Sequence, residues 1–277
     1  MVEYSGIACF GQRLKSTLAI GFNDIKRAIS KLDLVLFFAW GDTKARYRRS
    51  ALGPIWMIIS TSVSVAGLGF LWSMLLKQDS ATFIPSLTIG LVSWQFISGC
   101  ILESCSIFVR NSHFIRNIEN PYTLFPLQLV AKHLINLTHS FIVIVVVLFI
   151  FHQHISIGQL LFIPGLMLVI ANLLWISILL GIWGARFRDI EQIVSAMMPI
   201  IFFISPVIYR PNLLEVSQQA IVWLNPFSYL LALIRDPLIG ASINPFVYEV
   251  GCVAALVGWS FVIYSLGKNK GSISFWV

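Results

Sequence analysis

HLINLTHSFIVIVVVLFIFHQHISIGQLLFIPGLMLVIANLLWISILLGIWGA, residues 133–185, is the longest uncharged run of this chain and determines its fold class. It contains no Asp, Glu, Lys or Arg. About 20 residues are enough for one helix to cross a bilayer, so the stretch is too long for a single span. The polar sequence HQH at 152–154, followed by Gly158, supplies a turn near its middle. These residues therefore predict a hairpin of two membrane-spanning helices.

The rest of the chain repeats the pattern of long uncharged runs. The composition agrees with it, because 57% of the residues are hydrophobic and only 11% are charged, against about 25% in a soluble domain. The mean hydropathy is +0.84. We expect an all-α polytopic membrane protein with six transmembrane helices. Besides the two in the hairpin, the predicted spans are 52–76, 83–108, 192–208 (with Pro199 and Pro206 inside it) and 244–266.

The basic residues predict the orientation of these spans. Of the 19 Lys and Arg residues, a six-span threading leaves only Lys77, Arg210 and Arg235 on the outside. An excess of Lys and Arg in short inner loops is the usual topology signal, so both termini are expected in the cytoplasm. The apolar stretch 220–234 is interrupted by Asn225-Pro226, and counting it as a span would put Lys268 and Lys270 outside, against the inner bias. Residues 211–242 therefore predict two short helices at the outer interface.

Two cytoplasmic elements are also expected. Residues 22–40 have an apolar and a basic face, which predicts an amphipathic helix lying in the membrane interface, with Asn23 or Asp24 as its N-cap. The alternative, a short first span, would have too short an apolar stretch. A short helix is expected within 110–122, before Pro121. We treat 1–277 as one domain, with a cytoplasmic tail and interfacial helix (1–45), a six-span bundle (46–270) and a cytoplasmic tail (271–277).

Several function classes are disfavoured by the sequence. The net charge of +7 comes from loops beside apolar spans, which indicates topology rather than nucleic-acid binding. The phosphate-binding sequence G-x-x-x-x-G-K-[ST] is missing, so the chain is not expected to hydrolyse ATP. The outer loops have no clustered carboxylates for metal or acid-base chemistry, and the four Cys residues have no paired metal-ligand spacing. We therefore expect no catalytic residue, no metal site and no cofactor in this chain.

Two kinds of residue within the predicted spans are open to two interpretations each. Glu103, near the cytoplasmic end of its span, is either part of a transport pathway or a carboxylate at the membrane edge. Glu249 lies in the first turns of its predicted span, and this position near a helix N-terminus favours a structural role over a role in transport. Aromatic residues either line a sugar-conducting pore or form the ordinary interfacial belt and lipid-facing surface. The candidates for the pore are Trp72, Phe96, Phe202, Phe203 and Tyr209.

A series of short motifs carries a family resemblance. In order, they are R-Y-R-R-S-x-L-G-P-x-W at 46–56, G-L-x-x-W-Q-F at 90–96, R-F-R-D-I at 186–190, S-P-V-I-Y at 205–209 and L-N-P-F at 224–227. Their order and spacing over nearly the whole chain resemble the permease subunits of ABC type 2 exporters. Within these, the chain is most similar to the export permeases for O-antigen and capsular polysaccharide.

The resemblance implies a half transporter in the bacterial inner membrane that pairs with a second copy of itself. Two copies of a separate nucleotide-binding ATPase subunit would bind ATP and Mg, and lipid-linked polysaccharide would be the substrate. The short helix at about 112–120 would couple the permease to the ATPase. The outer helices at 211–242 would form a gate. The residues implied in coupling are Phe114, Ile115, Arg116, Ile118, Arg186, Arg188 and Asp189.

The basic stretch after residue 44 has two interpretations. Arg46, Arg48 and Arg49 either attract the anionic pyrophosphate of a lipid carrier or serve as the inner anchor of the first span. Two other functions stay open. One is export of small molecules or drugs by the same kind of permease, and the other is a membrane enzyme of lipid-linked sugar assembly.

Overall fold

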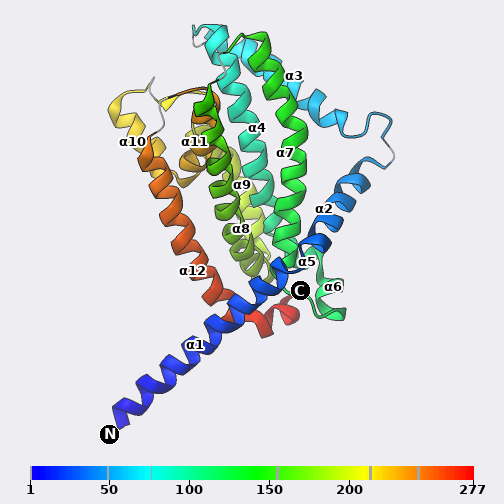
Figure 1. Cartoon of the computed structure of the whole chain (residues 1–277), viewed down its shortest axis with the longest axis vertical. Helices are drawn as coiled ribbons and strands as arrows, with labels where there is room; N and C mark the ends of the chain where they lie inside the picture. Colours follow the sequence, from blue (N-terminus) through cyan, green and yellow to red (C-terminus); the bar gives the residue numbers. More distant parts are fainter. Residues whose placement is uncertain (1, 49, 76, 154–155, 212–213, 242–243) are drawn as a thin grey trace.

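A computed structural model describes residues 2–48, 50–75, 77–153, 156–211, 214–241 and 244–277, with side chains from residue 14 onward. Within these ranges every regular element is helical, which confirms the all-α expectation. The longest helices run side by side in a bundle, and α1 crosses beneath it and projects beyond it (Figure 1). The elements in chain order are α1 (Val2–Ile29), α2 (Leu32–Tyr47), α3 (Ile55–Leu75), α4 (Ser80–Ser104), α5 (Ile107–Arg110), α6 (Ser112–Asn117), α7 (Leu124–Ile150), the 3-10 helix η1 (Ile157–Leu161), α8 (Phe162–Arg186), α9 (Asp189–Ile204), α10 (Val216–Leu224), α11 (Pro226–Leu238) and α12 (Pro245–Trp276).

Five helical segments in the described part of the chain are long and apolar enough to cross a membrane: α3, α4, α7, η1 with α8, and α12. The predicted hairpin is confirmed, since α7 and α8 flank a turn that begins after residue 150. The predicted fifth span, 192–208, corresponds to α9, which has 16 residues and ends before Pro206. A straight helix of that length is about 24 Å long, less than the roughly 30 Å of a hydrocarbon core. The expected count of six spans is therefore not confirmed.

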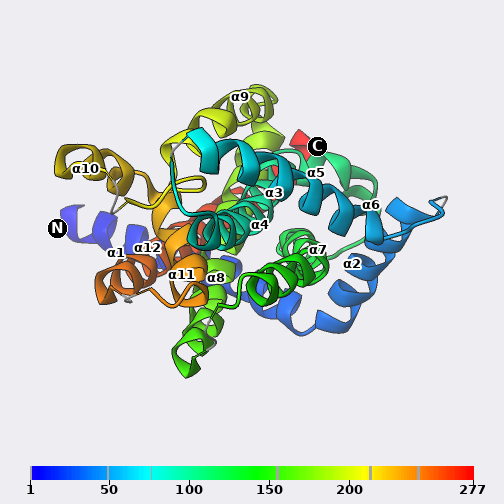
Figure 2. The ribbon, with the colours of Figure 1, turned by 90° about the horizontal axis from the view of Figure 1, so that it is seen from above.

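The centre of the bundle is α4, which is buried along most of its length. It packs against α3, α7, α8, α9 and α11. Viewed from above, α4 lies within a surround formed by these helices (Figure 2). Helix α11 packs into the bundle, because its residues 230–234 are buried against α4 and α8, while its place at the outer membrane interface stays a prediction. The Asn225-Pro226 interruption is confirmed as a helix start, with the Asn225 side chain accepting a hydrogen bond from the Phe227 N–H at 3.0 Å.

The N-terminal region differs from its prediction. The single helix expected at 22–40 is instead divided between α1 and α2 by a break at Ser30-Lys31. The expected N-cap at Asn23 or Asp24 is wrong, because α1 continues through both residues. Asp24 is instead fully buried, and both oxygens of its carboxylate contact other parts of the bundle. The position of this region in the membrane interface stays a prediction.

Helix α1 packs closely against α12 at two glycines. A Cβ atom on Gly21 would lie 2.1 Å from the Ile263 carbonyl oxygen, and one on Gly267 would lie 1.9 Å from the Thr17 carbonyl oxygen. Only a residue without a side chain permits these backbones to approach so closely. Helix α12 continues to Trp276, so the segment 271–277 expected as a tail is almost entirely helical.

Candidate functional site

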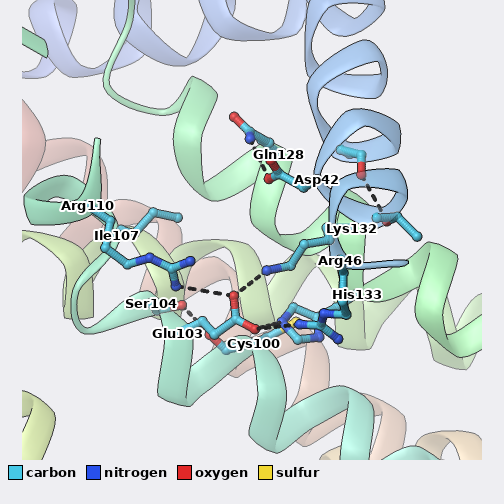
Figure 3. A network of polar contacts seen from close by, with 12 residues as sticks. Asp42, Arg46, Cys100, Glu103, Ser104, Ile107, Arg110, Gln128, Lys132 and His133 are labelled. Carbon is cyan, nitrogen blue, oxygen red and sulfur yellow. Dashed lines mark hydrogen bonds and ion pairs between the residues drawn. The ribbon is translucent and has the colours of Figure 1, made fainter. Parts of the chain in front are cut away.

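The most densely charged site in the described structure surrounds Glu103, at the C-terminal end of α4 (Figure 3). Lys132 Nζ donates a hydrogen bond to Glu103 Oε2, and Arg110 Nη1 lies 3.5 Å from the same oxygen. On the other carboxylate oxygen, Oε1, His133 Nε2 lies at 3.3 Å and Arg46 Nη2 at 3.7 Å. We call these five residues the Glu103 cluster. One carboxylate therefore faces four basic side chains.

Four helices bring these residues together. Glu103 lies in the last turn of α4, and Arg46 in the last turn of α2, which packs along α7. Arg110 ends the short α5. Lys132 and His133 lie on α7, which begins at Leu124, well before the predicted start of the uncharged stretch at residue 133. Helix α7 thus carries a charged residue, Lys132, just ahead of the stretch that charge counting assigns to the membrane.

The exposure of the basic side chains differs across the Glu103 cluster. The Lys132 and His133 side chains are only 10% and 8% exposed, whereas those of Arg46 and Arg110 are 49% and 60% exposed. Buried charges need compensating partners, and Glu103 supplies one. His133 Nε2 is buried and has no aligned hydrogen-bond partner, although it lies 3.3 Å from Glu103 Oε1. The cluster thus has basic groups in excess of the carboxylate that they share.

A cavity of about 310 Å³ opens beside the Glu103 cluster and is lined by Arg46, Glu103, Arg110 and Lys132. At its rim the Gln128 side-chain amide donates to Asp42 Oδ2 at 2.8 Å. A second cavity, of about 160 Å³, shares Arg46 with the first and continues beside His133. Its lining adds polar side chains from within the bundle, namely Gln95, Asn136 and Ser140. Gln95 Oε1 also accepts a hydrogen bond from the Thr61 hydroxyl at 3.3 Å.

This chemistry suits binding of an anion. Arg and Lys side chains are the usual ligands of phosphate groups. Among the residues that the structure describes, no group of three His, Cys, Asp or Glu side chains is placed to hold a metal ion.

The three arginines predicted for a lipid pyrophosphate are not all in this site. Arg46 belongs to the Glu103 cluster. Arg48 lines a separate cavity with Trp40, Tyr47 and His139. Arg49 lies outside the described residues.

The predicted coupling residues lie near the C-terminal end of α12, on and just after α6 and at the α8–α9 junction. On α6 and just after it, Phe114 is 44% exposed and Ile118 is 50% exposed, whereas Ile115 packs against a hydrophobic cluster. Arg116 donates a hydrogen bond to the Val277 carbonyl oxygen, so α6 contacts the end of α12. Figure 1 shows this proximity of α6 to the C-terminal end.

The second part of the coupling prediction is the loop between α8 and α9. The Arg186 guanidinium lies over the rings of Phe187 and Trp276, at 5.1 and 5.5 Å from their centroids. Arg188 and Asp189 are exposed where α9 begins. Arg186 therefore approaches the same end of α12 as Arg116 does. The role of Arg186, Arg188 and Asp189 in coupling stays a prediction.

The predicted pore aromatics divide into three places. Phe202, Phe203 and Tyr209 lie together at the C-terminal end of α9, where the Tyr209 hydroxyl donates to the Ile204 carbonyl oxygen at 2.7 Å. Phe96 is buried and lines the second cavity. Trp72 is half-buried on α3.

Sequence reasoning missed several residues of the site. Arg110, Lys132 and His133 were not selected, although Lys132 is the one charge between Pro121 and Ala185, which is a signal in itself. Trp94 was also missed: its ring lies 5.7 Å from that of Phe202 and 6.4 Å from that of Phe227. Asp24 was assigned to a helix end, and its burial has no signature in the sequence.

Comparison with known proteins gives consistent results. Residues 34–239 match the family described as ABC-2 type transporter. Two curated relatives in Klebsiella pneumoniae are each named O-antigen export system permease protein RfbA. They are 24% and 23% identical to this chain, over 82% of it and 90% and 89% of the relatives. A protein of the same name in Myxococcus xanthus is 23% identical over 72% of this chain and 77% of its own length.

Proposed function

The chain belongs to the ABC-2 type transporter family, and from this premise we propose that it is the permease subunit of an ATP-driven exporter of lipid-linked polysaccharide. The observation that carries the proposal is the similarity to O-antigen export permeases over most of both chains. The polymer would be of the O-antigen or capsule type. It would leave the cytoplasm across the bacterial inner membrane, with both termini of this chain inside.

The energy for export is proposed to come from another protein. The sequence lacks the phosphate-binding loop of an ATPase. We therefore assign ATP and Mg to a nucleotide-binding subunit, present in two copies beneath two copies of this chain.

The inner end of the bundle supports a route for coupling. Phe114 and Ile118 offer exposed apolar contacts for an ATPase, and Arg116 links α6 to the end of α12. Lys31 Nζ donates to the Asn120 side chain at 2.9 Å, which connects the same region to the break between α1 and α2. A displacement of α6 would therefore reach α1, α2 and α12 directly.

The aromatic residues at the outer end of α9 are candidates for the polysaccharide path. Stacking on aromatic faces would suit a sugar polymer, and Phe203 is 64% exposed in the single chain. The helices α10 and α11 adjoin this region and are the proposed outer gate.

The proposal is tested by deleting the gene and restoring it, with surface polysaccharide and intracellular lipid-linked polymer measured in each strain. Loss of surface polymer together with accumulation of lipid-linked polymer inside, both reversed by the restored gene, is the expected result. Unchanged surface polymer would contradict the proposal and would favour a small-molecule exporter of the same family.

A further inference from the structure

The geometry points to a binding seam for a lipid with a phosphate or diphosphate headgroup, between α3 and α7, with the Glu103 cluster as its head site. Glu103 occupies the position that the phosphate takes when the lipid is bound. The inference deepens the proposed function, on which the identity of the lipid as the polymer carrier rests. The binding itself depends only on the cavities and charges described here.

The head site is built for an anion. Arg46, Arg110 and Lys132 converge on one carboxylate, which a phosphate group can replace with more acceptor oxygens. His133 adds a nitrogen that is buried and lacks an aligned hydrogen-bond partner, although it faces the same carboxylate (Figure 3). The two most exposed members, Arg46 and Arg110, lie beside the 310 Å³ cavity through which a headgroup would enter.

The seam continues outward as a series of cavities of falling polarity. The second cavity lies between α3, α4 and α7, and its lining mixes Gln95 and Asn136 with Met57 and Phe96. The third cavity of this series, of about 430 Å³, lies farther along the same helices and is distinct from the cavity that Arg48 lines. Its lining is almost entirely apolar and includes Val65, Ala66, Ile142, Val146 and Ile150.

The third cavity is placed to hold an acyl or prenyl chain. Ile142, Val146 and Ile150 follow one face of α7 and are between 48% and 59% exposed, so the groove opens to the surrounding bilayer. Val146 is about 21 Å farther along α7 than Lys132, at 1.5 Å per residue. A charged site at the inner end and an apolar groove toward the outer end match the two parts of an amphipathic lipid.

Two lipids share this chemistry. One is a polyprenyl diphosphate carrier, and the other is an ordinary anionic phospholipid. Both place phosphate oxygens at the inner membrane surface, where Lys and Arg attract them. The experiment below separates them.

Binding is measured on the purified full chain in nanodiscs of phosphatidylcholine, with four probes. They are geranylgeranyl diphosphate, geranylgeraniol, inorganic diphosphate and phosphatidylglycerol. The head-site variants are Arg46→Gln, Arg110→Gln and Glu103→Gln, and Lys26→Gln, at an exposed site on α1, is the charge-matched control. For the groove, Ala66→Phe fills the third cavity, whereas Gly67→Phe on the same helix faces open space.

Losing one charge-assisted contact should weaken binding of geranylgeranyl diphosphate about tenfold in Arg46→Gln and in Arg110→Gln. Glu103→Gln should strengthen it, because the competing carboxylate is gone. Ala66→Phe should weaken geranylgeranyl diphosphate and leave inorganic diphosphate unaffected, while Lys26→Gln and Gly67→Phe match the wild type.

Tight binding of geranylgeranyl diphosphate with little competition from phosphatidylglycerol would identify a carrier-type lipid. Equal competition would support the seam with a phospholipid as its occupant. Binding that is unchanged in both arginine variants, or lost in Glu103→Gln despite a wild-type melting temperature, would overturn the inference. Since binding is measured on the pure chain and surface polymer in the cell, the seam and the export function can fail separately.

Discussion

Replacing Asp24 with Ala should release α1 from the end of the bundle at which α7 begins. Asp24 is fully buried, and its Oδ2 accepts hydrogen bonds from the Thr123 N–H and hydroxyl, both at 3.0 Å. Lys270 Nζ approaches Oδ1 at 3.0 Å as an ion pair. One carboxylate thus joins α1 to the start of α7 and to α12.

The magnitude follows from these contacts. Thr123 is only 1% exposed, so its N–H would lose its acceptor without gaining water, at a cost of about 1–3 kcal/mol. The Thr123 hydroxyl can rotate to another acceptor, and Lys270 is 32% exposed, so each adds at most about 1 kcal/mol. We expect a total near 3 kcal/mol for Asp24→Ala. Asp24→Asn keeps an acceptor oxygen for Thr123 and should cost about half as much.

Hydrogen exchange of the backbone amides in residues 14–29 measures this effect locally. A loss of about 3 kcal/mol lowers protection roughly a hundredfold if α1 opens without the rest of the bundle. Asn23→Ala, at the exposed neighbouring residue, is the control and should leave protection unchanged. Protection of α1 in Asp24→Ala equal to that of the wild type would refute the role given to this carboxylate.

Three further predictions concern packing, a buried charge and coupling. Gly267→Val should lower the melting temperature, since its Cβ would lie 1.9 Å from the Thr17 carbonyl oxygen and overpacking costs about 1–3 kcal/mol. The control Gly271→Val places its side chain in open space and should melt like the wild type. Arg235→Met should lower the melting temperature by more, because the buried guanidinium donates to two backbone carbonyls of the segment after α9 and pairs with its neighbouring carboxylate; an unchanged melting curve would contradict this. Phe114→Glu should stop polymer export with the melting temperature preserved, and normal surface polymer in that strain would exclude this side chain from coupling.

Most of the spans could be predicted from charge alone. Long apolar runs without charge have to be buried in lipid or protein. The uncharged runs 50–76, 80–102 and 133–185 therefore predict helices, and the structure contains helices in all three. The Asn225-Pro226 pair also predicts its helix boundary, because the cap and the proline act locally.

Helix ends were less predictable, because a charge can end a span without ending a helix. Helix α12 passes through Lys268 and Lys270 and continues to Trp276. Helix α7 starts at Leu124 and carries Lys132, whose charge is compensated by Glu103 on another helix. A rule that counts charges along the chain cannot detect a partner that is distant in sequence.

The candidate site was predictable only in part for the same reason. Glu103 and Arg46 were selected separately, one as an ionisable group in a span and the other as part of a basic stretch. Their meeting with Arg110, Lys132 and His133 depends on how α2, α4, α5 and α7 pack. Asp24 is similar, since its partners Thr123 and Lys270 come from two distant helices.

The most direct test of export is transport in proteoliposomes that contain this chain together with the proposed ATPase subunit and lipid-linked polysaccharide. The polymer starts on the ATPase side, and its arrival on the other side is followed by its susceptibility to a glycosidase added there. We predict movement that requires ATP, Mg and both proteins. Movement without the ATPase, or no movement of polymer while ATP is hydrolysed normally, would contradict the account.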